Sequence, residues 1–167
     1  HPRLARVATR IEAERLVLGV DGRKDVSLPL AAPSAPRREV QVWRHVGPAL
    51  DRGDEAAALF SDLLGLACRL VSLAPEHARR VNPERFAGEA HTGFSDGYPL
   101  LLLSEASLEA LNQRLPAPLP VNRFRPNLVV RGCAPFAEDG WKRIRIGDAV
   151  IEIVKPCDRC AIPTTDQ

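Results

Sequence analysis

Glycine and proline divide this chain into short segments. The 167 residues include 15 prolines and 11 glycines, two residue types that favour turns because of their special backbone angles. The longest apolar cluster, Tyr98-Pro99-Leu100 to Leu103, has only the size of a strand, and no run approaches the ~18 apolar residues of a membrane span. We therefore expect a mainly β (α+β) fold with a few short helices. The same pattern argues against a helix bundle, a coiled coil, collagen or a membrane protein.

The charge and cysteine content exclude further classes. Lys and Arg total 23 against 21 for Asp and Glu, a net charge of +2, so no strong field favours nucleic acid or an acidic membrane. The four cysteines are too few and too scattered for a secreted disulfide scaffold. We therefore expect a reducing compartment and a cytoplasmic location. Because the chain starts at His1 and contains no Met, we expect it to be a piece of a longer protein.

Alternating apolar and polar residues predict strands in the first half. Residues 15–20 and 26–30 flank Asp21-Gly22, a pair that favours a hairpin turn. Residues 40–46 alternate again and predict a further strand. A helix is then expected, with Asp54 as its cap and Gly65 at its C-terminal end.

The second half is predicted to mix strands with one helix. The apolar segment 98–103 predicts a buried strand. Ser104 is expected to cap a helix that Pro116 ends, because leucines recur between them at helical spacing. Residues 143–146 and 149–154 predict a hairpin across a two-residue turn that begins with glycine.

The motif Cys157-Asp158-Arg159-Cys160 is the sharpest chemical feature. Two thiols at this spacing suit half a zinc site, a redox pair or a thiolate ligand to another metal. A closed zinc site needs four ligands, and Cys68 and Cys133 stand alone. A thioredoxin-type pair sits at the start of a helix, which Pro163 interrupts here. Two semi-buried cysteines without a role remain an equally open interpretation.

Two further segments have the groups to bind a polar ligand. In Phe124-Arg125-Pro126-Asn127 the guanidinium of Arg125 suits a phosphate or a heterocycle edge, and Asn127 both donates and accepts. Pro126 is expected to bias Arg125 towards an extended backbone. The alternative is a turn with a solvated arginine and an Asn that bonds its own backbone.

The second segment, Phe94-Ser95-Asp96-Gly97-Tyr98-Pro99, lies at the end of a long polar loop, residues 74–97, which shows no regular period. Loops of this length in compact domains are usually functional or mobile. Gly97 allows a close approach of the backbone to a ligand, and Asp96 can accept hydrogen bonds from it. A simple Asp-Gly turn before a strand is the alternative.

Taken in order along the chain, these motifs resemble the MOSC-domain family, in the branch that joins bacterial YcbX-like proteins and mitochondrial amidoxime-reducing components. The resemblance is strong over residues 92–167 and looser over residues 1–91. It implies part of a MOSC N-terminal β-barrel domain over 1–73 and a MOSC β-barrel domain, truncated at its C-terminal end, over 74–167. The motifs that carry it are Asp96-Gly97-Tyr98-Pro99, Ser104-Glu105-Ala106-Ser107-Leu108, Phe124-Arg125-Pro126-Asn127 and Cys157-Asp158-Arg159-Cys160 with Thr164-Thr165.

The resemblance implies a molybdenum cofactor, molybdopterin, whose dithiolene and one protein thiolate hold the metal. The matching thiolate is that of Cys160, which is therefore expected to be the metal ligand and the catalytic cysteine. The matching cofactor-binding residues are Arg125, Asn127, Asp96, Gly97 and Tyr98.

The implied activity is the reduction of small N-hydroxylated compounds with electrons from a partner reductase or a ferredoxin-like domain. An iron–sulfur cluster is conceivable only in a C-terminal domain that this chain lacks, and no nucleic-acid partner is expected. Two alternatives stay open. One is a sulfur-carrier or cofactor-handling module of the pyridoxal-phosphate-linked sulfurases, and the other is a non-catalytic β domain.

Overall fold

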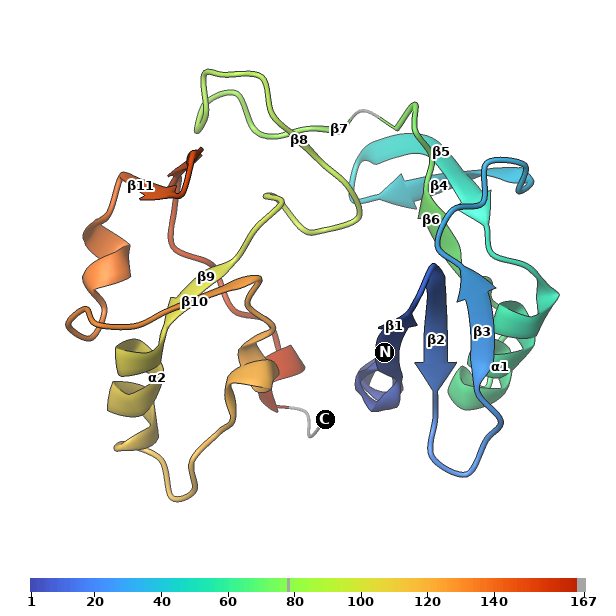
Figure 1. The fold of residues 1–167 in the computed structure, drawn as a ribbon, viewed down its shortest axis with the longest axis horizontal. Helices are drawn as coiled ribbons and strands as arrows, with labels where there is room; N and C mark the ends of the chain where they lie inside the picture. The colour runs from blue at the N-terminus through green and yellow to red at the C-terminus, as the bar shows by residue number, and fades with distance from the viewer. Residues whose placement is uncertain (78, 165–167) are drawn as a thin grey trace. The chain divides into compact units, whose positions relative to one another are not determined.

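The computed structural model describes residues 1–77 and 79–164. The chain divides into two compact units, His1–Arg79 and Arg80–Gln167, which run from blue to green and from green to red in Figure 1. Both units consist mainly of short strands and turns, and the described residues form α-helices at α1 (Asp54–Leu64) and α2 (Glu105–Asn112). The expectation of a mainly β fold with short helices is confirmed. No helix in the described ranges is both long and apolar enough to cross a bilayer.

The first unit contains two antiparallel three-stranded sheets. Residues 15–20 and 26–30 pair as predicted, with Leu16 opposite Leu28, although the connection between them is longer than a two-residue turn. The elements before α1 and the strand after it are η1 (Pro2–Arg6), β1 (Ala8–Glu12), β2 (Arg15–Gly19), β3 (Val26–Pro29), β4 (Arg37–Val42), β5 (His45–Asp51) and β6 (Val71–Leu73), in the sheet orders β1-β2-β3 and β4-β5-β6.

The prediction of one strand over residues 40–46 is wrong. The chain reverses at Trp43, whose φ of 57° is left-handed, and Val42 pairs with His45 across the turn. Apolar and polar residues continue to alternate through this tight turn, so the sequence pattern hides the reversal.

Helix α1 closes the core of the first unit. Apolar side chains of α1, including Phe60 and Leu63, pack with Leu18 and Leu28 from the sheet β1-β2-β3. Gly65 ends the helix with φ 73° and ψ 24°, as predicted. The N-cap, however, is Gly53 and not Asp54, which is the first helical residue. A carboxylate in the first turn still favours the positive end of the helix dipole.

A buried carboxylate links the end of β5 to α1. Asp51 has 3% of its side chain exposed and accepts hydrogen bonds from Arg38 and from two nitrogens of Arg69, Nε at 2.5 Å and Nη2 at 2.8 Å. Its Oδ1 also accepts from the backbone N–H of Gly53 at 2.8 Å. One side chain therefore joins β4, the start of α1 and the segment before β6.

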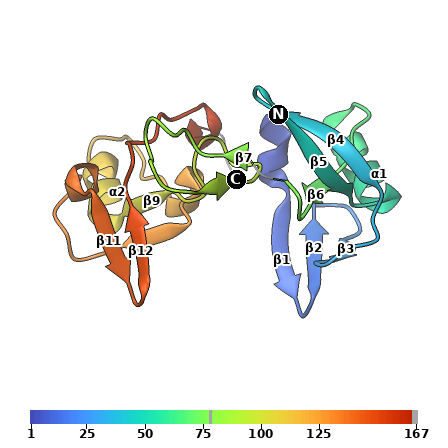
Figure 2. The same ribbon diagram turned by 90° about the horizontal axis from the view of Figure 1, so that it is seen from above.

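The second unit has a different topology. Strands β9 and β10 form a parallel pair with Leu102 opposite Leu128, and β11 and β12 form the predicted hairpin through Gly147, with φ 58° (Figure 2). The elements around α2 are β7 (Arg79–Arg80), β8 (His91–Thr92), β9 (Leu102–Ser104), η2 (Val121–Phe124), β10 (Leu128–Val130), η3 (Ala137–Gly140), β11 (Arg143–Ile146), β12 (Ala149–Glu152) and η4 (Ile162–Thr164).

Two boundaries in this unit differ from the predictions. The segment 98–103 is not a buried strand, because pairing begins only at Leu102 and Leu100 is 48% exposed. Helix α2 ends at Asn112, before Pro116. The side chain of Asn112 donates to the carbonyl of Leu119 at 3.0 Å and accepts from its N–H at 2.9 Å, so it ties the chain into the following loop.

Ser104 caps α2 as predicted. It is fully buried, and its Oγ accepts the N–H of Ser107 at 3.0 Å. Its own N–H donates to Oε1 of Glu138 at 2.9 Å. Burial favours the neutral form of Glu138, but hydrogen bonds from Ser107 and Ser104 outweigh it and hold the pKa of Glu138 below its usual value. The cap thus joins α2 to η3.

Ser104→Ala is expected to destabilise the protein by about 1–2 kcal/mol, because it removes the helix cap inside a buried network. Denaturant unfolding of the two proteins measures this difference. The matched control is Ser34→Ala, at an exposed position, for which we expect a change within about 0.5 kcal/mol. Equal effects at the two positions would contradict the role of Ser104 as a cap.

Candidate functional site

The parallel pair β9-β10 brings two of the predicted binding segments together. Asn127 Oδ1 accepts the N–H of Leu101 at 2.9 Å, across 26 residues of sequence, and the Asn127 N–H donates to the Leu101 carbonyl at 2.8 Å. The segment that follows Asp96-Gly97-Tyr98 is therefore fastened to the turn at Arg125. The Asn127 side chain does not bond its own backbone, contrary to that alternative, and its amide nitrogen has no partner in the described chain.

Arg125 adopts a left-handed backbone with φ 52° and ψ 46°. The expectation of an extended conformation is wrong, because Arg125 closes the 3₁₀ turn η2 and its N–H donates to the Asn122 carbonyl at 3.0 Å. Such a conformation costs a non-glycine residue about 1–3 kcal/mol, and Ala13, Trp43 and Phe136 share the positive φ. The side chain is exposed, so the turn presents its guanidinium to solvent.

The cysteine motif is attached to the same turn. Arg159 Nη2 donates to the carbonyl of Phe124 at 2.8 Å, and the guanidinium lies 5.6 Å from the centre of the Phe124 ring. Arg159 Nη1 also donates to Cys157 Sγ at 3.4 Å. Cys157 and Cys160 are both free thiols and both exposed, so the interpretation as semi-buried cysteines is wrong.

The Asp96-Gly97-Tyr98 segment is open to a ligand. An added Cβ at Gly97 would meet nothing within 4 Å, so the backbone is accessible there. Asp96 is exposed and Tyr98 is half-buried. The backbone at Gly97 and the side chain of Asp96 are therefore both accessible.

An exposed ion pair connects the cysteine motif to the segment that precedes it. Lys155 Nζ donates to Asp158 Oδ2 at 2.5 Å, which raises the pKa of Lys155 and lowers that of Asp158. The nearby Tyr98 also raises the pKa of Lys155, whereas Arg85 lowers it. The hydrogen bonds from Leu101 to Asn127 and from Arg159 to Phe124 bring together, in the second unit, the segments that carry Tyr98, Asn127 and Cys160.

The described residues do not supply a complete metal site. In the ranges 1–77 and 79–164, no group of three or more His, Cys, Asp or Glu side chains could hold a metal ion. A metal at Cys160 would therefore take most of its ligands from a bound group. Thr164 lies in η4 and its Oγ1 donates to the Ala161 carbonyl at 2.6 Å, whereas Thr165 lies outside the described residues.

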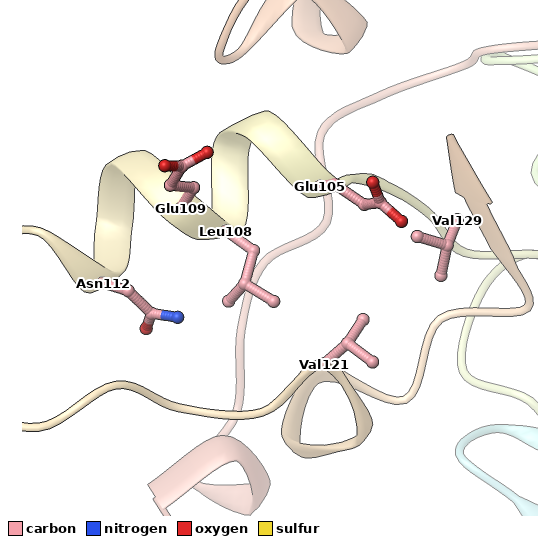
Figure 3. Close-up of a pocket in the computed structure, with 6 residues that line it drawn as sticks. All are labelled: Glu105, Leu108, Glu109, Asn112, Val121 and Val129. Atoms are coloured by element: carbon pink, nitrogen blue, oxygen red, sulfur yellow. The ribbon is translucent and has the colours of Figure 1, made fainter. Parts of the chain in front are cut away.

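A separate groove lies between α2 and η2 (Figure 3). It has a volume of about 260 Å³, and the predicted site residues do not line it. The floor of the groove is apolar, and the carboxylates of Glu105 and Glu109 line one side of it. These negative charges do not suit an anionic ligand. The lining residues are Glu105, Leu108, Glu109, Asn112, Val121 and Val129.

Phe124 and Arg159 belong to two of the sequence motifs, but no role was predicted for either residue. The structure shows that they join the motifs to each other. The only available signal was an arginine between two cysteines, and sequence gives no indication of which carbonyl such a side chain will reach.

Two family models match this chain, and curated relatives align with almost all of it. A model of the MOSC N-terminal beta barrel domain matches residues 1–67, and a model of the MOSC domain matches residues 89–167. Mitochondrial amidoxime-reducing component 1 is 36% identical in Mus musculus and 35% in Homo sapiens, in each case over 99% of this chain and 50% of the relative. Mitochondrial amidoxime reducing component 2 of Rattus norvegicus is 34% identical over 99% of this chain and 51% of the relative.

The chain spans about half the length of these curated relatives. The two domain models match adjacent stretches that together account for most of the sequence. The chain belongs to the MOSC-domain family.

Proposed function

We propose that this chain binds a molybdenum cofactor in its second unit, and that the protein to which it belongs reduces N-hydroxylated compounds. The observation that carries the proposal is the similarity to amidoxime-reducing components over 99% of the chain. The hydrogen bonds that link the segments of Tyr98, Asn127 and Cys160 to one turn support it, because they gather the candidate ligand residues in one region of the second unit.

The donor groups fit such a cofactor. The exposed thiol of Cys160 can supply a soft thiolate ligand, and the absence of a nearby cluster of protein ligands in the described ranges suits a metal already held by a dithiolene. The Arg125 guanidinium can form two parallel hydrogen bonds with a phosphate. The free amide nitrogen of Asn127 and the open backbone at Gly97 suit the polar edges of a pterin.

When bound, the cofactor would supply the two electrons that cleave an N–O bond. Cys160 would hold the metal, Arg125 would neutralise the phosphate, and Asn127 would keep the Leu101 segment beside the turn while donating to the pterin. A partner reductase or a ferredoxin-like domain would provide the electrons. The comparisons give no support for an iron–sulfur cluster, and the cytoplasmic location stays a prediction.

The reaction itself tests the proposal. The full-length protein, purified from a host that makes molybdenum cofactor and supplied with a reduced viologen, is offered an aryl amidoxime. Two electrons and two protons convert each amidoxime into an amidine and water. We expect amidine formation only from protein made in the cofactor-competent host. Equal turnover by protein from a host that cannot make the cofactor, or no turnover by fully loaded protein, would overturn the proposal.

The sulfur-carrier alternative rests on one observation, the exposure of both Cys157 and Cys160. It requires a persulfide on one of these thiols and no tightly bound pterin. Mass spectrometry of the purified full-length protein distinguishes the two functions directly.

Arg125→Gly separates the ligand role of this residue from its structural role. We expect the free energy of unfolding to rise by about 0.5–1 kcal/mol. Glycine removes the strain of the left-handed backbone in the folded state, and this gain exceeds the cost of the extra conformational entropy that glycine gives the unfolded chain. Retention of the cofactor should fall about tenfold through loss of the charged donor. Denaturant unfolding and the pterin content after dialysis measure the two effects.

Ala13→Gly is the matched control, because Ala13 has the same φ of 52° and no ligand role. It should gain similar stability without losing pterin. A loss of stability in Arg125→Gly would instead assign the arginine side chain to the packing of the fold.

A further inference from the structure

The cysteine-bearing loop has little backbone structure of its own. Residues 153–160 form neither helix nor strand. Within the described chain, residues 157–160 make no hydrogen bond between backbone groups. The position of residues 157–160 therefore depends on side-chain contacts, of which the described chain shows those of Arg159 and the pair Lys155–Asp158.

The pair Lys155–Asp158 cannot place the loop, because both partners belong to it and lie three residues apart. Arg159 is different, since it reaches 35 residues back to the carbonyl of Phe124. Its contact with the Phe124 ring adds a cation–π interaction at 5.6 Å. Arg159 is therefore the long-range contact made by the cysteine motif itself, and a second link follows the motif, where Arg123 Nη1 donates to the carbonyl of Pro163 at 3.3 Å.

The attachment joins the neighbours of two candidate ligand residues. Phe124 directly precedes Arg125, and Arg159 directly precedes Cys160. The same guanidinium also donates to Cys157 Sγ at 3.4 Å, so it contacts the first cysteine of the motif while its backbone directly precedes the second. A movement of Arg159 would change the separation between the Arg125 guanidinium and the Cys160 thiol.

We propose that Arg159 is a positioning residue, which holds Cys160 and Arg125 at the separation that one cofactor requires. This inference rests on the proposed function. The role needs a planar fork of donors, because one nitrogen serves the Phe124 carbonyl and another serves Cys157 Sγ. The lysine ammonium has the same charge but concentrates it on one nitrogen. It therefore cannot donate to the Phe124 carbonyl and to Cys157 Sγ while it also packs against the Phe124 ring.

The test compares full-length wild-type protein with Arg159→Lys and with Arg143→Lys. Arg143 is a matched control, since it forms one exposed ion pair with Glu152 in the hairpin β11-β12. Hydrogen exchange is measured in cofactor-free protein over residues 121–127 and 157–164. The rate of molybdenum release is measured in loaded protein by elemental analysis after dialysis.

In Arg159→Lys we expect about tenfold faster exchange at the hydrogen-bonded amides of residues 121–127, such as those of Arg125 and Asn127, because a charged hydrogen bond that holds this turn is lost. The amides of residues 157–160 have no backbone hydrogen bond and should exchange rapidly in both proteins. Exchange in α2 should not change. Molybdenum release should accelerate about ten- to one-hundredfold, the usual effect of removing a group that orients a metal ligand. Arg143→Lys should match the wild type in both measurements.

Each other result decides against the inference. Wild-type exchange in Arg159→Lys would show that this side chain does not hold the loop. Faster exchange with unchanged molybdenum release would reduce Arg159 to a structural contact. A wild-type protein without molybdenum would overturn the proposed function and this inference together, whereas a loaded wild type with an unaffected Arg159→Lys overturns this inference alone.

Discussion

Cys160→Ser in the full-length protein is expected to lose its molybdenum, whereas Cys157→Ser keeps it. Serine replaces a soft thiolate by a hydroxyl, which is a poor ligand for a metal bound through sulfur. We expect the molybdenum content per chain to fall by tenfold or more, because removal of the ligand itself should weaken binding by at least the ~10-fold that follows from disturbing a ligand's surroundings. Elemental analysis of the purified variants measures it.

Cys157→Ser is the matched control for Cys160→Ser. Cys157 and Cys160 are both exposed free thiols three residues apart, so each substitution should change the stability by less than about 0.5 kcal/mol. If Cys157→Ser lost the metal and Cys160→Ser retained it, the assignment of the ligand would be wrong. Loss in both variants would mean that the two thiols share the role.

The second large effect concerns the fold of the first unit. Asp51→Asn keeps an acceptor for the Gly53 N–H but removes the charge that faces Arg38 and Arg69. We expect a loss of about 2–3 kcal/mol, less than for a fully buried pair because the arginines are partly exposed. Denaturant unfolding at pH 7 measures it. The control Asp54→Asn, a 95% exposed partner of Arg69, should change stability by less than about 0.5 kcal/mol.

The contribution of Asp51 should also depend on pH. Hydrogen bonds from Arg69 and then Arg38 hold the pKa of Asp51 well below its ordinary value, against the opposite effect of burial. Because the pKa is lower in the folded state, this stabilisation is complete above the pKa of the unfolded chain, about 4, and is lost progressively below it. The difference between wild type and Asp51→Asn should therefore narrow between pH 6 and pH 3. A constant difference would contradict this assignment.

Local patterns predicted those elements whose boundaries depend on local chemistry. The helix end at Gly65 and the cap at Ser104 follow from the conformational preferences of single residues. The helix end at Asn112 could not be predicted, because it depends on hydrogen bonds to Leu119. The reversal at Trp43 was hidden because alternation continues through a two-residue turn.

The candidate site also combines features that single residues determine with features that depend on long-range contacts. The sequence predicted which residue types could bind, but their convergence depends on the parallel pairing of β9 with β10. The left-handed backbone of Arg125 depends on the closure of η2, against the local preference before a proline. The proposed roles of Asp96, Gly97, Tyr98, Arg125, Asn127 and Cys160, and the domain limits 1–73 and 74–167, stay predictions.

The most direct test of cofactor binding is the molybdenum and pterin content of the full-length protein from a cofactor-competent host. Elemental analysis gives the metal, and fluorescence of the oxidised pterin gives the organic part. We predict about one molybdenum and about one pterin per chain, since the protein positions a cofactor that carries the chemistry. A folded protein that contains neither molybdenum nor pterin would contradict the account.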